Sequence, residues 1–312
     1  MEKRLTTPDG TPVSRLAFGT MQFGGRADQA ASREMFEASL DAGINHFDTA
    51  YVYNGGASEE LLGSMIGNRR DTMLIATKAA YDGGGSRQNI LNSFGVSQKR
   101  LGLDVIDVLY MHRFDPDTDL QESIEALAGL KQSGRIRYIG LSNFAAWQVM
   151  KAISIAEKLG ETIDILQPMY NLVKRQAEVE ILPMCADQKV ACAPYSPLGG
   201  GLLTGKYAAG ASGRLTEDDG YARRYGPGWM HEAAVSLGEI ASETGTHVAT
   251  LAVAWAAAHD SGPTPIISAR NAEQLRPSLD ALSFRMDAEL YARLAALSPT
   301  PPPATDRLEE QS

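Results

Sequence analysis

Short apolar runs alternate with longer amphipathic stretches along almost the whole chain. The runs are rich in Ile, Val and Leu, which is typical of parallel strands buried on both faces. The stretches between them repeat apolar residues at helical spacing. This pattern predicts strands at residues 16–19, 44–48, 73–78, 105–112, 136–142, 165–170, 190–196 and 265–268. It predicts helices at residues 28–42, 58–66, 86–101, 120–133, 145–159, 177–188 and 231–259.

About eight strand–helix units in 312 residues are what a (β/α)8 barrel requires. The alternative is a doubly wound parallel sheet, which would normally carry a G-x-G-x-x-G fingerprint after its first strand. Residues 18–25, with the sequence FGTMQFGG, lack that spacing. We therefore expect an α/β fold, a (β/α)8 TIM barrel that forms one domain over residues 1–312. An N-terminal β-hairpin is expected over residues 4–18, with its turn at Pro8-Asp9-Gly10.

Two segments depart from the strand–helix repeat. Residues 208–229, after the seventh strand, are rich in Gly, Asp and Arg and are too long for an ordinary connection. This long loop is either a lid over the site or a tolerated surface insertion. Residues 299–312 are Pro-rich and then charged, which predicts a poorly ordered tail.

The composition narrows the possible partners. A formal net charge of -9 argues against a nucleic-acid partner and against docking on anionic membranes. The two cysteines, Cys185 and Cys192, have no further ligands nearby, so we expect free thiols and no metal site. The N-terminus leads into no apolar signal segment and no run reaches membrane-spanning length, which makes the cytoplasm the expected location. Nothing in the chain indicates an oligomeric state.

Polar and titratable residues stand at the carboxyl ends of the predicted strands, where a barrel collects its catalytic groups. They are Asp48 with nearby Tyr53, then Lys78, His112, Ser142-Asn143, Gln167 and Tyr195-Ser196. Each has an ordinary interpretation when taken alone, such as a solvated lysine or a structural histidine. Their shared position at successive strand ends favours a common site.

Asp, Tyr, Lys and His together indicate proton donation by a tuned phenol. A tyrosine titrates near pH ~10, which is too high for free proton exchange at neutral pH. A neighbouring ammonium would lower that pKa, and a carboxylate would keep the lysine charged and in place. A neutral histidine could orient the substrate oxygen. Such a site protonates an alkoxide as it forms, so it needs a hydride donor.

At these positions the chain resembles the aldo-keto reductase superfamily, from about the N-terminal hairpin to Leu282. The resemblance rests on residues 47–53 (FDTAYVY), 58–63 (SEELLG), 76–78 (ATK), 107–112 (DVLYMH), 134–143 (GRIRYIGLSN), 167–171 (QPMYN) and 195–198 (YSPL). It implies an NADP-dependent reductase of aldehydes or ketones. Tyr53 would be the general acid, Lys78 and Asp48 would tune it, and His112 would orient the carbonyl.

The resemblance also implies where the cofactor binds. The nicotinamide would stack on Tyr195, and Ser142, Asn143 and Gln167 would bind its carboxamide. Glycines in residues 196–206 would let the backbone approach the pyrophosphate, although a merely flexible loop is the alternative. The full predicted cofactor set is Gly19, Thr20, Met21, Asp48, Ser142, Asn143, Gln167, Tyr195, Ser196, Pro197, Leu198, Gly200, Lys206, Ser268, Arg270 and Gln274.

Residues 265–275 (PIISARNAEQL) resemble the adenosine-phosphate loop of the family. Arg270 is the natural partner for a 2′-phosphate, because a guanidinium binds phosphate as a fork, and this favours NADPH over NADH. Two departures weaken the match. Ser268 stands where many relatives have glycine, and residues 276–278 (RPS) replace an acid-x-asparagine pattern.

The substrate side is less determined. His112 in place of a glutamate implies carbonyl reduction rather than double-bond reduction. Arg113 could favour anionic or phosphorylated aldehydes, or it could pair with Asp115 or Asp117 in its own loop. The expected small-molecule pocket is walled by Met21, Tyr53, Tyr81, His112 and Arg113, with Trp229 as a further candidate.

Two other functions stay open at this point. Some barrels of this family bind the cofactor and regulate a partner such as a membrane channel, and they can keep the same four residues. The reaction could also run toward oxidation, as in sugar or alcohol dehydrogenases, because the site is microscopically reversible.

Overall fold

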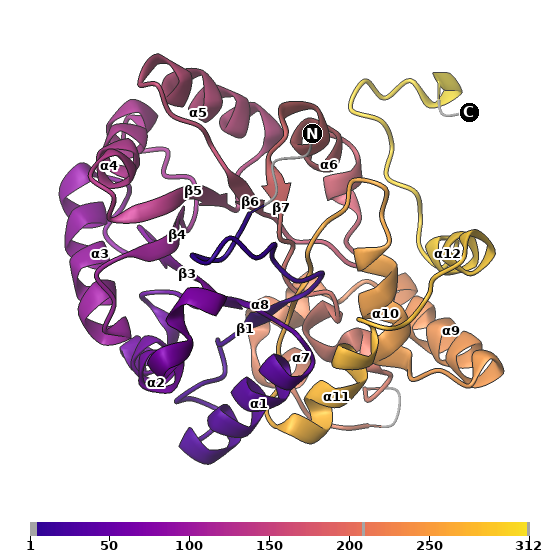
Figure 1. Ribbon diagram of the computed structural model, residues 1–312. Helices are drawn as coiled ribbons and strands as arrows, with labels where there is room; N and C mark the ends of the chain where they lie inside the picture. The colour runs from indigo at the N-terminus through magenta and orange to yellow at the C-terminus, as the bar shows by residue number, and fades with distance from the viewer. Residues whose placement is uncertain (1–4, 208–209, 311–312) are drawn as a thin grey trace.

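The computed structural model describes residues 5–207 and 210–310. Eight parallel strands curl into a barrel-like sheet (Figure 1), with the order β7-β6-β5-β4-β3-β2-β1-β8. The sheet closes between β8 and the segment that begins at β7, through the parallel bridge Tyr195–Ile266 and backbone hydrogen bonds of 2.8 Å from the Ile266 N–H to the Pro194 carbonyl and from the Thr264 N–H to the Cys192 carbonyl. The strands are β1 (Ala17–Gly19), β2 (His46–Asp48), β3 (Leu74–Ala79), β4 (Ile106–Met111), β5 (Ile136–Ser142), β6 (Ile165–Gln167), β7 (Ala191–Cys192) and β8 (Ile266–Ile267). The predicted α/β class and the eight parallel strands are confirmed.

Helices surround the strands (Figure 1). They are α1 (Gln29–Asp41), α2 (Ala57–Ile66), α3 (Arg87–Leu101), α4 (Leu120–Gln132), α5 (Ala146–Lys158), α6 (Ile181–Gln188), α7 (Arg214–Glu217), α8 (Asp219–Arg224), α9 (Gly228–Thr244), α10 (Val248–Ala257), α11 (Ala272–Asp280) and α12 (Ala288–Ala295). Shorter 3-10 turns are η1 (Tyr53–Gly56), η2 (Gly67–Thr72), η3 (Gln176–Glu178), η4 (Gly199–Thr204) and η5 (Leu308–Glu310). Polar caps fix several helix starts, since Asp28, Ser86 and Asp119 each accept a hydrogen bond from a first-turn backbone N–H.

The predicted helix over residues 231–259 was wrong as one element. The chain breaks at Gly245, whose φ of 62° lies in the left-handed region and ends α9. His247 then caps α10 by accepting a hydrogen bond from the Ala249 N–H. Residues after β8 also form α11 and α12, which the pattern did not predict.

The sixth and seventh strands are shorter than predicted. Pro168 and Pro194 stand just beyond β6 and β7, and a proline has no N–H to continue a ladder. The two segments still meet at an isolated parallel bridge between Met169 and Tyr195. The chain therefore stays extended toward the barrel rim without forming a regular strand.

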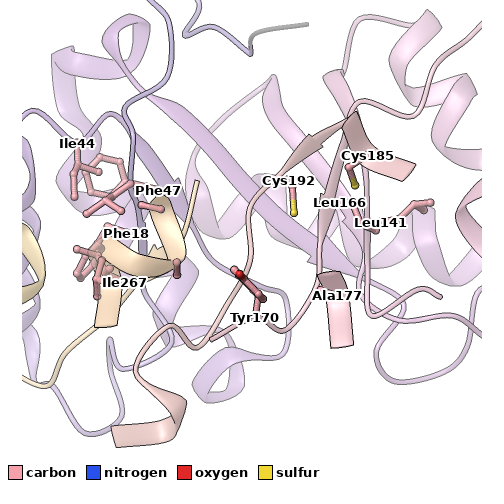
Figure 2. Packing of buried hydrophobic residues seen from close by; sticks show 14 of the residues in the cluster. Phe18, Ile44, Phe47, Leu141, Leu166, Tyr170, Ala177, Cys185, Cys192 and Ile267 are labelled. Carbon is pink, nitrogen blue, oxygen red and sulfur yellow. The ribbon is translucent and has the colours of Figure 1, made fainter. Parts of the chain in front are cut away.

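Successive side chains along each strand point to opposite faces of the sheet, so the buried apolar residues form two separate clusters. Phe18, Phe47 and Ile267 face outward and pack between sheet and helices, as Figure 2 shows. Ala17, Leu74 and their counterparts on the other strands fill the barrel interior, together with Leu5 from the N-terminal segment. Most interior residues toward the bottom of the barrel are apolar, with buried His46 of β2 as an exception, and the polar inward residues that line the cavity stand at its carboxyl end.

Several terminal and loop predictions are only partly covered by the described residues. Residue 4 of the predicted hairpin lies outside them, and the rest contains one isolated antiparallel bridge, Thr6–Pro12. Residues 208–209 of the long loop and residues 311–312 of the tail also lie outside. The hairpin and the disordered tail stay predictions. Within the described parts of the chain, no helix has the length and apolar character needed to cross a membrane.

Helices α2 and α3 pack closely at Gly63. A Cβ at this position would lie 2.6 Å from the Leu101 carbonyl oxygen and 2.8 Å from that of Arg100, and backbone atoms cannot swing aside. We expect Gly63→Ala to lower the free energy of unfolding by about 1–3 kcal/mol, measured by urea denaturation. Gly95→Ala on α3 is the control, because nothing lies within 4 Å of its Cβ position. That control should be neutral or stabilising, by up to about 1 kcal/mol. Equal stability of Gly63→Ala and wild type would contradict the close packing.

Candidate active site

The structure brings the four predicted catalytic residues together at the carboxyl end of the barrel. Lys78 Nζ lies 2.5 Å from Asp48 Oδ1 and 3.5 Å from the Tyr53 hydroxyl. It also donates a hydrogen bond of 2.7 Å to the Thr49 carbonyl. The His112 ring stands nearly perpendicular to that of Tyr53, with 6.0 Å between centroids. The lysine is thus held by three oxygens, one of which is the phenol.

The protonation states follow from burial and from this pairing. Burial alone would lower the pKa of Lys78, but Asp48 and Tyr53 raise it more, so it lies above its ordinary value and the amine stays charged. Burial raises the pKa of the Tyr53 phenol, and Lys78 counteracts this only in part. Lys78 lowers the pKa of Tyr53 as predicted, but burial has the larger effect, so the pKa lies above its ordinary value instead of below it. Tyr53 holds its proton at neutral pH, which is the state a proton donor needs.

His112 is a neutral imidazole in this site. Burial, followed by the charges of Lys78 and Arg113, lowers its pKa to about 3. Its Nδ1 atom is buried and has no hydrogen-bond partner among the described residues. A neutral imidazole can orient a carbonyl oxygen without competing with Tyr53 as the acid.

Hydrogen bonds from Asn54 and Arg100 hold the turn that carries Tyr53 in place. Asn54 adopts a left-handed conformation with φ of 51°, and its side-chain amide donates to the carbonyls of Met21 and Phe23. Arg100 on α3 donates to the Tyr51 carbonyl, at 2.9 Å, and forms an ion pair with buried Glu59. The residues before and after Tyr53 are therefore both fixed by hydrogen bonds.

A hydrogen-bonded network links the next strand ends to the catalytic residues. The Gln167 amide donates to Asp48 Oδ2 at 2.8 Å, and the Ser142 hydroxyl donates to the Gln167 carbonyl. The Asn143 amide donates to the His112 carbonyl at 2.9 Å, and the Tyr195 hydroxyl donates to Asn143 Oδ1 at 2.7 Å. The residues predicted to hold a nicotinamide are thus connected by hydrogen bonds to Asp48 through Gln167 and to His112 through Asn143.

A cavity of about 1180 Å³ opens above this network. All five residues predicted to face the substrate line it. So does every predicted cofactor residue except Thr20, whose buried hydroxyl is bonded to Ser58 and to the Asp48 carbonyl instead. Trp229, at the start of α9, is not part of this lining. Lys78 lies behind Tyr53, outside the lining.

The glycine turn and the segment after β8 form the far end of the cavity. Gly199, Gly200 and Gly201 all have positive φ, and a Cβ at Gly200 would lie 2.8 Å from the Tyr221 ring. The Ser268 Oγ atom is buried, and no partner for it exists among the residues described. A cradle without Cβ atoms and an unpaired buried hydroxyl fit a bound phosphate-bearing cofactor.

A family model described as the aldo/keto reductase family matches residues 15–299. The chain belongs to this family. The family is one of NAD(P)H-using oxidoreductases that act on small carbonyl compounds, and this aldo/keto reductase is accordingly an oxidoreductase.

Similar proteins cover nearly the whole chain. It is 35% identical to the uncharacterized oxidoreductase YrpG of Bacillus subtilis, with 94% of each chain covered. It is 32% identical to the L-glyceraldehyde 3-phosphate reductase of Escherichia coli, covering 91% of this chain and 88% of that protein. A probable voltage-gated potassium channel subunit beta of Oryza sativa is also 32% identical, over 95% of this chain and 96% of that protein.

Sequence reasoning missed one wall of the reductase cavity. Arg214, Tyr221 and Arg224, from α7 and α8, line it, and the two guanidinium carbons lie 5.2 and 5.0 Å from the centroid of the Tyr221 ring. Arg214 also contacts the sulfur of Met21 across the cavity, at 3.8 Å. The arginine-rich composition of residues 208–229 was the available signal. The described part of this segment thus supplies part of the cavity lining.

Proposed function

We propose that this aldo/keto reductase catalyses the NADPH-dependent reduction of an aldehyde or ketone to the alcohol, with Tyr53 as proton donor. The observation that carries the proposal is the charged Lys78 ammonium, held by Asp48 at 2.5 Å and lying 3.5 Å from the Tyr53 hydroxyl. An ammonium in that place stabilises the phenolate that proton donation leaves behind.

The roles of the residues follow from their places in the site. The bound cofactor would supply a hydride from nicotinamide C4. The substrate oxygen would lie between the Tyr53 hydroxyl and the neutral His112 ring, which fixes the direction of the carbonyl. Tyr53 then transfers its proton to the forming alkoxide, while Asp48 keeps Lys78 charged and in position. Ser142, Asn143, Gln167 and Tyr195 would hold the nicotinamide beside it.

The direct test follows NADPH consumption with 4-nitrobenzaldehyde, a reactive test substrate. We expect one alcohol to form for each NADPH consumed. NADPH binding without turnover of any aldehyde or ketone would instead favour a cofactor-binding subunit of a larger assembly; the Oryza sativa relative is named a probable voltage-gated potassium channel subunit beta. Measuring the reverse reaction with NADP and the product alcohol compares the two directions.

Arg270 supports the choice of NADPH. Its guanidinium lines the cavity beyond the glycine turn and lies 3.8 Å from Glu217 of α7. We expect Arg270→Ala to weaken NADPH binding by about 10- to 100-fold, because a charge-assisted hydrogen bond to phosphate is lost, and to affect NADH little. Fluorescence titration with both cofactors measures this.

Arg276→Ala is the matched control. Arg276 is exposed on α11, outside the cavity lining, so the variant loses the same charge six residues away. It should keep the wild-type ratio of NADPH to NADH affinity. An equal loss for both cofactors in Arg270→Ala would remove Arg270 as the ligand of the 2′-phosphate.

A further inference from the structure

Arg113 occupies a defined place at the rim, one residue beyond His112. Its guanidinium carbon lies 4.7 Å from the centroid of the Tyr81 ring, and that ring lies 4.8 Å from the His112 ring. Both Arg113 and Tyr81 are exposed and line the cavity. The Tyr81 ring therefore contacts both the Arg113 guanidinium and His112, the residue proposed to orient the substrate carbonyl.

The acids of its own loop form no ion pair with Arg113, although the Arg113 charge makes the smallest of the contributions that lower the pKa of Asp115. Asp115 accepts hydrogen bonds from the Gly85 N–H, the Thr118 hydroxyl and the Asp117 N–H, which occupy both of its oxygens. Arg113 forms no ion pair with any acid in residues 5–207 and 210–310. The guanidinium is stacked on one face and keeps its N–H edge free to bind a ligand.

The charge of the cavity contrasts with that of the whole chain. The lining contains five basic residues, Arg113, Lys206, Arg214, Arg224 and Arg270, and three acids, Asp48, Asp82 and Glu273. Asp48 is paired with Lys78, so the lining carries a positive excess in a protein whose formal net charge is -9. Lys206 and Arg270 lie at the proposed phosphate end of the cofactor. Arg113 is the lining arginine that follows His112 in the chain and lies near it.

We propose that the substrate of this reductase is an aldehyde or ketone bearing a carboxylate or phosphate, and that Arg113, stacked on Tyr81, binds this anionic group. The inference rests on the proposed function and specifies its substrate class. A guanidinium forks onto either oxyanion, while Tyr53 and His112 bind the carbonyl oxygen at the other end of the same small molecule.

Matched pairs of aldehydes test the inference. For the carboxylate, 4-carboxybenzaldehyde is compared with methyl 4-formylbenzoate; for the phosphate, 4-formylphenyl phosphate is compared with 4-methoxybenzaldehyde. The readout is the ratio of kcat/KM for the charged member to that for the neutral member, so a general loss of activity cancels. We expect wild type to prefer at least one charged member by about 10-fold or more, and Arg113→Gln to lower that ratio by about 10- to 100-fold, chiefly through KM. The two pairs show which oxyanion is bound.

Two further variants locate the effect. Arg33→Gln removes the same charge from an exposed position on α1, outside the cavity, and should keep the wild-type ratio. Arg113→Lys keeps the charge without the fork and should give an intermediate ratio. If Arg113→Gln does not fold, Arg113→Lys and the salt dependence of wild type decide: added NaCl should raise KM for the charged member only.

Several results would overturn the inference. They are a wild-type ratio near one for both pairs, an unchanged ratio in Arg113→Gln, or a loss found only in Arg224→Gln, which would place the anion on the opposite wall. Any of these can occur while neutral aldehydes are still reduced, which leaves the proposed function intact. Failure of the proposed function has a different signature, because then neither member of either pair is reduced.

Discussion

Replacing Tyr53 by phenylalanine is expected to lower kcat for aldehyde reduction by about 10²- to 10⁴-fold, the usual contribution of a positioned general acid. The variant loses only the hydroxyl that lies 3.5 Å from Lys78 Nζ. His112 cannot replace Tyr53 as the acid, because its pKa of about 3 leaves the ring neutral at the pH of the reaction. Stopped-flow measurement of the hydride-transfer step separates this loss from any change in product release.

The pH profile gives a second signature of Tyr53. Burial raises the pKa of its phenol, and reduction needs the protonated form, so kcat should hold through neutral pH and fall only as the pH rises through that pKa. His112, with a pKa of about 3, stays neutral throughout and adds no decline of its own above that value. The residual rate of Tyr53→Phe should lack the alkaline decline.

Tyr51→Phe is the matched control for Tyr53→Phe. It removes a hydroxyl two residues away, from a ring that packs against the Arg100 guanidinium. Its kcat should stay close to that of wild type. A Tyr53→Phe variant that retained kcat within a few-fold of wild type would disprove proton donation by Tyr53.

Lys78→Met is expected to cost both activity and stability. Activity should fall by about 10²-fold or more, because the phenolate loses its neighbouring charge. The free energy of unfolding should fall by about 3–5 kcal/mol, because Asp48, which is 2% exposed, is left as a buried charge without its partner. The pKa of Lys78 is raised in the folded state, so this stabilisation is fully present at neutral pH and is lost only as the pH rises past that value.

The double variant Lys78→Met/Asp48→Asn separates the two effects. It removes both charges, so urea denaturation should show that much of the lost stability returns, while kcat stays low. A single Lys78→Met variant as stable as wild type would contradict the buried ion pair. Recovery of kcat in the double variant would contradict the role of the ammonium in catalysis.

The parts of the fold that depend on local pattern could be predicted from the sequence. Apolar runs located all eight strands, because each strand is buried on both faces and reads as a continuous signal. The break at Gly245 was missed, since apolar residues continue on both sides of it and one glycine is tolerated within a helix. The ends of β6 and β7 were misjudged because prolines interrupt the ladder while the chain stays extended.

In the candidate site, too, some features could be predicted from the sequence and others could not. Asp48, Tyr53, Lys78 and His112 could be named because each stands at a strand end or just beyond it, and such positions converge. The pKa of Tyr53 could not be predicted, because the balance between burial and the Lys78 charge depends on how deeply the ring is enclosed. Tyr221 and its flanking arginines were missed, because nothing local tells a surface insertion from a segment that folds back over the cavity.

The junction at which the sheet closes, between β7 and β8, is the part of the barrel that we expect to unfold locally first. The β7–β8 junction has one bridge, between Ile266 of β8 and Tyr195 just after β7, and two backbone hydrogen bonds, whereas β4 and β5 pair along five registered positions. Amide protons along this seam should exchange with solvent before those of β3 to β5. The segments that follow the two seam strands are those assigned here to the pyrophosphate and the 2′-phosphate. A dinucleotide bound by both segments would hold the β7 and β8 ends of the sheet together. Cofactor binding should therefore stabilise the junction of the barrel that has the fewest backbone contacts.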